Sequence, residues 1–105
     1  VEPENAAILA GGNVGTHLQM GIGDGLIPDN LDRTIYSHIY VVSDEEAIET
    51  ARDLARKEGL MCGISSGTNV AAALKLAEKL GPGKTVVTVL PDTAERYFST
   101  PLFER

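Results

Sequence analysis

The chain has 105 residues, of which 43% are hydrophobic and 23% are charged, as is typical of a soluble globular domain or a piece of one. Its net charge of -6 disfavours a nucleic-acid partner, because phosphate binding depends on clustered Lys and Arg. No apolar run is long enough to span a membrane, and the first residues lack the pattern of a signal peptide. We expect the chain to begin in mid-protein.

The cysteine and histidine content argues against disulfides and metals. The single cysteine, Cys62, cannot form an internal disulfide, which favours a reducing cytoplasm. It lies in an apolar run without a basic neighbour, so we expect a buried and inert thiol. His17 and His38 are far apart and have no neighbour at metal-ligand spacing. The sequence therefore predicts no metal site.

Residues 1–34 form a loop-rich segment. Residues 6–10 are apolar enough for one or two helical turns, which Gly11-Gly12 would end. The remainder is dominated by glycine, proline, aspartate and asparagine, which favour turns. A long loop in a compact domain usually has a function, so this segment is expected to contribute to a site.

Residues 35–105 alternate between strand and helix patterns. Residues 36–42 predict a strand, and Ser43 with Glu46 forms a capping box that starts a helix ending at Gly59. A short strand over residues 60–64 and a helix over residues 65–80 follow. The clearest strand covers residues 84–90, and a short helix is expected over residues 94–99. The inner face predicted for the second helix consists of Val70, Leu74, Ala77 and Leu80.

This order of elements predicts an α/β fold with a mainly parallel sheet flanked by helices. The second helix carries Ala71-Ala72-Ala73 and is apolar around much of its circumference, so it needs neighbours on several sides. The sequence therefore describes part of a larger sheet better than a free-standing domain.

Ligands of open α/β sheets bind at the carboxyl ends of strands, and three segments are expected there: residues 21–25, 63–67 and 90–93. Each also has a purely structural interpretation. The serines Ser65 and Ser66 suit helix capping, Pro91 suits the end of a strand, and the glycines of residues 21–25 suit a flexible loop. The loop is an incomplete dinucleotide fingerprint, which leaves a small nucleotide- or phosphate-binding module as an alternative.

These segments belong to a longer ordered set of motifs. The set is Val1-Glu2-Pro3, Gly11-Gly12, Gly21-Ile22-Gly23, Ile27-Pro28, Asn30-Leu31-Asp32, Glu45-Glu46-Ala47-Ile48, Glu58-Gly59-Leu60, Gly63-Ile64-Ser65-Ser66-Gly67, Leu90-Pro91, Glu95-Arg96-Tyr97 and Ser99-Thr100. In this order the motifs resemble the C-terminal part of cysteine synthase (O-acetylserine sulfhydrylase), a fold type II enzyme dependent on pyridoxal phosphate (PLP). The resemblance covers essentially the whole chain. Each motif is modest alone, but the ordered set is specific.

The resemblance implies a role for five residues. Ser65 matches the serine whose hydroxyl binds the pyridine nitrogen of PLP, and Pro91 matches the proline that packs beside the ring. Gly21, Ile22 and Gly23 match the loop that lies next to the substrate and moves as the site closes. Residues 1–105 would then be a C-terminal fragment of the PLP-binding large domain. Within it, residues 1–34 would be an active-site segment and residues 35–105 a β-α-β-α-β segment.

The implied reaction is the formation of L-cysteine from O-acetylserine and sulfide. In the family, the lysine that binds PLP covalently lies upstream of the segment that this chain matches. The sequence around that lysine differs from the sequence around each of the chain's four lysines, which are Lys57, Lys75, Lys79 and Lys84. No catalytic residue is therefore assigned, and the isolated chain is expected to be inactive. The resemblance also implies a cytoplasmic homodimer with an amino-acid substrate and with serine acetyltransferase as a partner.

Two positions depart from the family pattern. Met20 stands where cysteine synthases commonly have glutamine, with Gln19 one residue earlier, and Asp92 replaces the serine after Pro91. An acidic residue after this proline resembles the pattern of cystathionine β-synthase, a sister enzyme. The activity of that enzyme is therefore the alternative. A non-catalytic α/β fragment with a structural or docking role is the other alternative.

Overall fold

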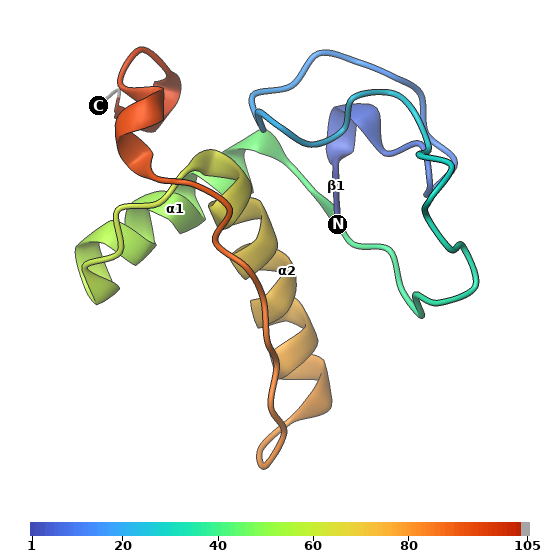
Figure 1. Cartoon of the computed structure of the whole chain (residues 1–105). Helices are drawn as coiled ribbons and strands as arrows, with labels where there is room; N and C mark the ends of the chain where they lie inside the picture. Colours follow the sequence, from blue (N-terminus) through green and yellow to red (C-terminus); the bar gives the residue numbers. More distant parts are fainter. Residues whose placement is uncertain (104–105) are drawn as a thin grey trace.

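The computed structural model describes residues 1–103, and its elements are arranged around the long second helix (Figure 1). The loop-rich first part of the chain lies on one side of that helix, and the first helix lies with the C-terminal segment on the other. In chain order the elements are β1 (Glu2–Pro3), the 3-10 helix η1 (Glu4–Ala6), β2 (Val41–Val42), α1 (Asp44–Glu58), α2 (Ile64–Leu80), and the 3-10 helices η2 (Ala94–Tyr97) and η3 (Pro101–Phe103).

The two strands are short and parallel, and with the helices they confirm the predicted α/β class. Glu2 pairs with Val41 and Pro3 with Val42, and the amide of Glu2 donates to the carbonyl oxygen of Tyr40 at 2.8 Å. The strand predicted over residues 36–42 is thus limited to its last two residues. Strand geometry persists only where a neighbouring backbone supplies hydrogen bonds, and β1 supplies two residues.

Helix α1 forms where the capping signals predicted it. The Ser43 hydroxyl accepts from the Glu46 amide at 3.2 Å, and the Glu46 carboxylate accepts from the Ser43 amide at 3.3 Å. Both bonds satisfy amides that lack helical partners. Gly59 ends the helix in the left-handed conformation, with φ of 70°, as predicted.

The two helices pack very closely because small residues line their contact. A Cβ atom added to Gly67 would lie 2.0 Å from the carbonyl oxygen of Ala47. Ala47 and Ala51 of α1 belong to the same buried core as Ala71 and Ala72 of α2. The predicted inner face is wrong at two positions, since Leu74 is 61% and Leu80 is 45% exposed. A helix that is apolar on most sides does not reveal from its sequence which side faces its neighbour.

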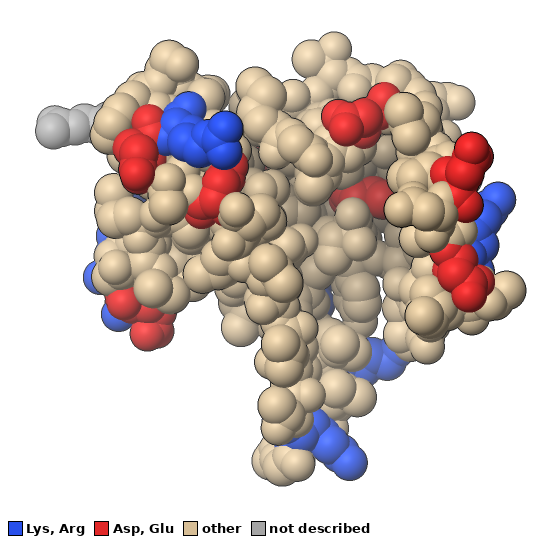
Figure 2. All heavy atoms as spheres, in the orientation of Figure 1, with Lys and Arg blue, Asp and Glu red and all other residues tan. Residues whose placement is uncertain are grey.

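Residues 84–90 form no strand, contrary to the prediction, because no described segment pairs with their backbone. The segment runs alongside α2, held by a 2.9 Å hydrogen bond from the Asn69 side chain to the carbonyl oxygen of Val89. Val87 is 85% exposed. Figure 2 shows few charged atoms along this segment, except at its lower tip. The apolar pattern is that of a strand covered on both faces, but the covering layers are not among residues 1–103.

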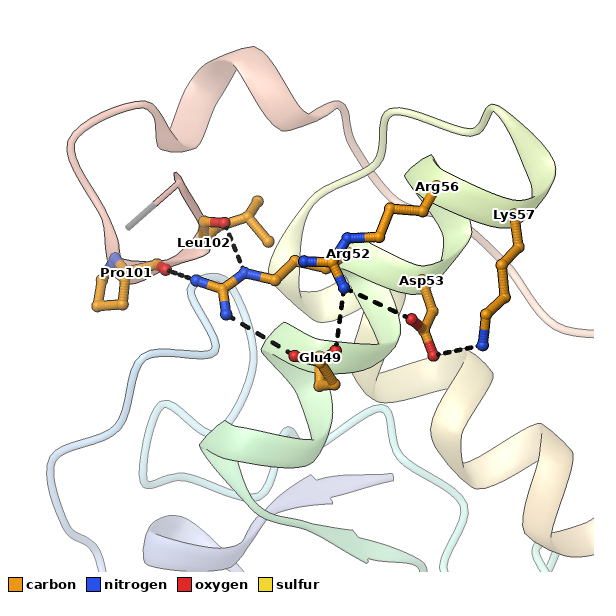
Figure 3. Close-up of polar contacts among 7 residues, drawn as sticks. All are labelled: Glu49, Arg52, Asp53, Arg56, Lys57, Pro101 and Leu102. Carbon is orange, nitrogen blue, oxygen red and sulfur yellow. Dashed lines mark hydrogen bonds and ion pairs between the residues drawn. The ribbon is translucent and has the colours of Figure 1, made fainter. Parts of the chain in front are cut away.

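The other predicted strand, residues 60–64, is reduced to one antiparallel bridge between Cys62 and Thr93, because Ile64 already begins α2. The short helix expected over residues 94–99 is the 3-10 helix η2. That C-terminal segment is held to α1 by Arg52, which donates to the carbonyl oxygens of Leu102, at 3.0 Å, and of Pro101 (Figure 3). Among residues 1–103, no helix has the length and hydrophobicity to cross a membrane.

Candidate functional site

The first turn of α2 carries three buried hydroxyl side chains. Ser65 is 3% exposed, and Ser66 and Thr68 are fully buried. Thr68 donates to Gln19 at 2.7 Å, whereas the Ser66 oxygen has no hydrogen-bond partner among residues 1–103. A buried polar atom without a partner is uncommon in a folded protein. The turn therefore holds hydrogen-bonding capacity that the described part of the chain does not use.

Gly63 brings this turn against the segment that follows Pro91. Its amide donates to the carbonyl oxygen of Asp92 at 3.3 Å, and the Ala94 amide donates to the carbonyl oxygen of Met61 at 3.1 Å. A Cβ atom on Gly63 would lie 1.9 Å from the Asp92 carboxylate and 2.6 Å from the Tyr97 ring. Only glycine allows the two backbones to approach so closely.

Asp92 and Tyr97 form a hydrogen-bonded pair at this contact. The Tyr97 hydroxyl donates to Oδ2 of Asp92, while Oδ1 is buried without a partner in the described structure. Burial first, and then the bond to Asp92, raise the pKa of Tyr97 to about 12. The tyrosine is therefore a neutral donor at ordinary pH, and it fixes the orientation of the carboxylate.

The glycine loop of residues 21–25 joins the same region. A hollow of about 310 Å³ is lined by Met20, Gly21, Asp92, Arg96 and Tyr97. Gly21, Gly23 and Gly25 have φ values of 89°, 66° and 81°, a region that favours glycine. The rest of the loop borders a second hollow of about 240 Å³ against the N-terminal segment. The segments expected at the strand ends thus meet, although residues 60–64 and 84–90 are not strands.

The structure places the five predicted site residues as follows. Ser65 is buried, Pro91 and Gly21 are exposed, and Ile22 and Gly23 are half-buried. Gly21 shares its hollow with Asp92, the neighbour of Pro91, and Asp92 binds Gly63, two residues before Ser65. No hydrogen bond within residues 1–103 joins Ser65 to the glycine loop.

Gln19 anchors the glycine loop, and sequence reasoning missed this role. The side chain is fully buried and donates to the Val42 carbonyl oxygen at 2.9 Å and to the Asp44 carboxylate at 3.0 Å. It also accepts from Thr68 at 2.7 Å. One residue later, Met20 is 50% exposed and lines the hollow. A lone glutamine before a glycine loop carries no periodic signal that would have indicated burial.

Two other expectations concern cysteine and nucleotides. Cys62 is buried as predicted, and burial raises the pKa of its thiol, with a smaller contribution from the charge of Asp92. Residues 26–40 contain no helix, so the glycine loop lacks the strand-loop-helix frame of a dinucleotide site. Residues 1–103 hold no group of three or more side chains placed to bind a metal.

A comparison with protein families matches residues 1–92 to the model for "pyridoxal-phosphate dependent enzyme". The chain belongs to this family of PLP-dependent enzymes. It is 48% identical over 103 residues to cysteine synthase of Staphylococcus aureus, strain N315, and the match covers 98% of this chain and 33% of that protein. The chain thus spans about a third of the length of the curated relatives it matches.

Solved structures agree with this family assignment. The cysteine synthase of Entamoeba histolytica has a TM-score of 0.91 at 39% identity, covering 99% of this chain and 31% of that one. An O-acetylserine dependent cystathionine β-synthase from Helicobacter pylori has a TM-score of 0.87 at 44% identity, covering 97% and 33%. The resemblance to cysteine synthase and the fold type II architecture are confirmed, over about a third of the length of these relatives.

The first turn of α2 fits the pyridine ring of this family's cofactor. Ser65 offers a neutral hydroxyl, and the unpartnered Ser66 oxygen shows further polar capacity in the same buried turn. A neutral hydroxyl can hydrogen-bond an unprotonated pyridine nitrogen, whereas a carboxylate would hold that nitrogen protonated. All four lysines are exposed, and none lines the hollow beside Gly21. The turn therefore has hydroxyl groups of the kind that suit the ring, and the hollow beside Gly21 is lined by no lysine.

Proposed function

We propose that the whole protein is a PLP-dependent β-replacement enzyme that makes L-cysteine from O-acetylserine and sulfide. The chain, residues 1–105, is a C-terminal fragment of its PLP-binding large domain, with residues 1–34 in the active site and residues 35–105 as the β-α-β-α-β segment. The observation that carries the proposal is the meeting of three segments: the Ser65 turn, the Asp92 turn and the Gly21 loop.

The overall reaction exchanges one bond at the substrate β-carbon for another. The Cβ–O bond of O-acetylserine breaks, and acetate leaves with its electron pair. A sulfur lone pair forms the Cβ–S bond, and the proton of the sulfur donor passes to solvent. PLP, when bound, supplies the electron sink that makes the β-carbon reactive.

In this proposal each segment has one task. The Ser65 hydroxyl donates to the pyridine nitrogen and leaves it uncharged, which moderates the electron sink and suits elimination over transamination. Pro91 packs beside the ring. Gly21, Ile22 and Gly23 close over the substrate and exclude water, with the positive φ of Gly21 and Gly23 allowing the loop to pass close to it.

The lysine that holds PLP covalently lies outside this chain, so the isolated chain has no activity in this proposal. Lys57 pairs with Asp53 at 3.1 Å and Lys75 with Glu46 at 2.8 Å, both on the helix surface. We further propose that the whole protein is a cytoplasmic homodimer and a partner of serine acetyltransferase. These assignments rest on the resemblance and on the single cysteine, Cys62.

The test compares the whole protein with the isolated 105-residue chain. The whole protein is expected to show the visible absorbance of bound PLP and to form cysteine from O-acetylserine and sulfide. The isolated chain is expected to form none at any PLP concentration. A colourless whole protein that takes up no PLP would refute the proposal. Cysteine formation by the isolated chain would refute the claim that the PLP-binding lysine lies outside this chain.

A second activity, that of a cystathionine β-synthase, is favoured by one observation. Asp92 brings a carboxylate to the wall of the hollow beside Gly21, where cysteine synthases commonly have a serine. Assays of the whole protein with homocysteine in place of sulfide distinguish the two activities. Cystathionine formation supports the second activity, and its absence limits the protein to sulfide.

A further inference from the structure

The side chain of His17 contacts both ends of the glycine loop. Its Nδ1 atom accepts from the backbone amide of Gln19 at 3.1 Å, and its Nε2 atom lies 3.2 Å from the carbonyl oxygen of Gly23. Residues 20–22 lie between these two partners, and two of them line the hollow beside Gly21. One half-buried imidazole therefore spans the part of the loop that borders the hollow.

The two partners of His17 are backbone groups, and they determine where the imidazole carries its hydrogen. The amide of Gln19 can only donate, so Nδ1 must present a lone pair. The carbonyl oxygen of Gly23 can only accept, so Nε2 must carry the hydrogen and donate it. The neutral tautomer with its hydrogen on Nε2 is thus the one form of the ring that makes both bonds.

The backbone on either side of His17 is attached to other elements. The carbonyl oxygen of Thr16 accepts from the side chain of Asn5 at 3.2 Å. The amide of Leu18 donates to the Asp44 carboxylate, at the start of α1, at 3.0 Å. The imidazole therefore extends to the glycine loop from a stretch of chain that is itself held in place.

The glycine loop has few restraints of its own. Within residues 1–103, residues 20–25 make two hydrogen bonds, from the Ile22 amide to the Gln19 carbonyl oxygen at 3.4 Å and from His17 to Gly23. The first is long for a backbone bond, and long bonds are weak. A Cβ atom added to Gly23 would lie 3.0 Å from Nε2 of His17, so the loop passes close to the ring. The bond to His17 is therefore the main polar restraint on the far end of the loop.

We propose that His17 is a positioning residue, which holds the glycine loop in the shape that closes over the substrate. The inference rests on the proposed function, in which Gly21 lies next to the substrate. Nδ1 fixes the near end of the loop and the Nε2 hydrogen fixes the far end, so Gly21 and Ile22 are held between two attached points. A loop that is ordered before the substrate binds loses less conformational freedom on closing.

The experiment measures kcat/KM of the whole protein, with PLP bound, for O-acetylserine and for sulfide separately. In ping-pong kinetics each of these values reports the half-reaction of its own substrate. His17→Phe keeps a ring but loses both bonds, and it should lower kcat/KM for O-acetylserine about tenfold, the effect of one hydrogen bond. The value for sulfide should stay unchanged, because a single heavy atom makes few contacts with the loop. His38→Phe, at an exposed position, is the matched control and should change neither value.

Two conservative variants separate the two bonds. The amide nitrogen of His17→Gln can replace Nε2 and donate to Gly23, whereas the amide oxygen of His17→Asn can replace Nδ1 and accept from Gln19. We expect His17→Gln to keep most of the kcat/KM for O-acetylserine and His17→Asn to lose as much as His17→Phe. Equal losses in the Gln and Asn variants, an equal loss with sulfide, or no loss in any variant would overturn the inference.

A second measurement does not depend on activity. The ring nitrogens of His17 are observed by ¹⁵N NMR in the whole protein labelled at histidine, with the signal assigned by its loss in His17→Gln. The expected result is a hydrogen on Nε2 and a bare Nδ1 under the conditions of the assay. A hydrogen on Nδ1 would overturn the inference and leave the proposed function intact. A whole protein that forms no cysteine overturns the proposed function, and the positioning role with it, whichever tautomer is found.

Discussion

The side chain of Gln19 donates a 2.9 Å hydrogen bond to the carbonyl oxygen of Val42, and both residues are fully buried. Through this bond the glycine loop is fastened to the end of β2, and through Thr68 it is fastened to α2. The loop that borders the candidate site is thus attached to both elements at Gln19. Its anchor is one residue away from Met20, which faces the hollow.

Gln19→Ala should therefore destabilise the protein by about 3 kcal/mol, because it leaves several buried polar groups without partners. The predicted observation is a clear fall in the Tm of the whole protein, with PLP present throughout. Met20→Ala is the matched control, since that side chain is half exposed, and it should leave the Tm nearly unchanged. Equal Tm values for the two variants would contradict the anchoring role.

Gly63→Ala tests the close approach of the Ser65 and Asp92 turns. The new Cβ would lie 1.9 Å from the Asp92 carboxylate, so the two turns must separate, and we expect a loss of about 1–3 kcal/mol. Asp92→Ala alone should cost less, and it should recover part of the loss in the double variant by removing the nearer obstacle. The check is a double-mutant cycle of thermal stability. Strict additivity of the two changes would show that the side chains do not meet.

The capping box of α1 should contribute measurably to stability. Ser43→Ala removes the acceptor of the Glu46 amide and should cost about 1 kcal/mol. Ser37→Ala, at an exposed loop position, should cost almost nothing. Denaturant unfolding of the two variants under the same conditions provides the measurement. A cost at Ser43 no larger than that at Ser37 would mean that the capping box does not stabilise the helix.

Tyr97 predicts a pH dependence at the alkaline end. Its folded-state pKa of about 12 lies above the ordinary value of 10.0, so the neutral tyrosine is favoured by folding. The contribution of neutral Tyr97 to the stability of the folded protein should be complete below pH 10 and should be lost as the pH rises through 12. The difference in phenolate absorbance between wild type and Tyr97→Phe reports this titration. A midpoint near 10 would contradict both causes of the raised pKa, the burial of Tyr97 and its bond to Asp92.

Local signals in the sequence predicted the helices well, because caps and apolar spacing act within a few residues. Ser43, Glu46 and Gly59 define α1 through contacts with their own neighbours in sequence. Residues 84–90 have an equally clear pattern, yet form no strand, since a strand requires a paired backbone. Val86, Val87 and Val89 have the pattern of a strand that is paired at its edges and covered on both faces. Residues 1–103 provide neither the paired strand nor the covering layers.

Only the grouping of the candidate segments could be predicted from position along the chain. The segments of Ser65, Pro91 and Gly21 were expected near strand ends, and the structure brings these segments together. The roles of the individual residues, which the resemblance implies, stay predictions. Gln19 and the pairing of Asp92 with Tyr97 could not be predicted, because each depends on where another segment lies in space. A single polar residue in a loop has no pattern that distinguishes a buried anchor from a solvated side chain.

The central claim is that Ser65 supplies the hydrogen bond to the pyridine nitrogen of PLP. Its most direct test is the visible absorbance spectrum of bound PLP in the whole protein, recorded across pH for wild type, Ser65→Ala and Ser65→Asp, with Ser37→Ala as control. We predict that Ser65→Asp shifts the spectrum and abolishes most cysteine formation, that Ser65→Ala retains more activity than Ser65→Asp, and that Ser37→Ala matches wild type. A Ser65→Asp protein with the wild-type spectrum and rate would contradict the claim.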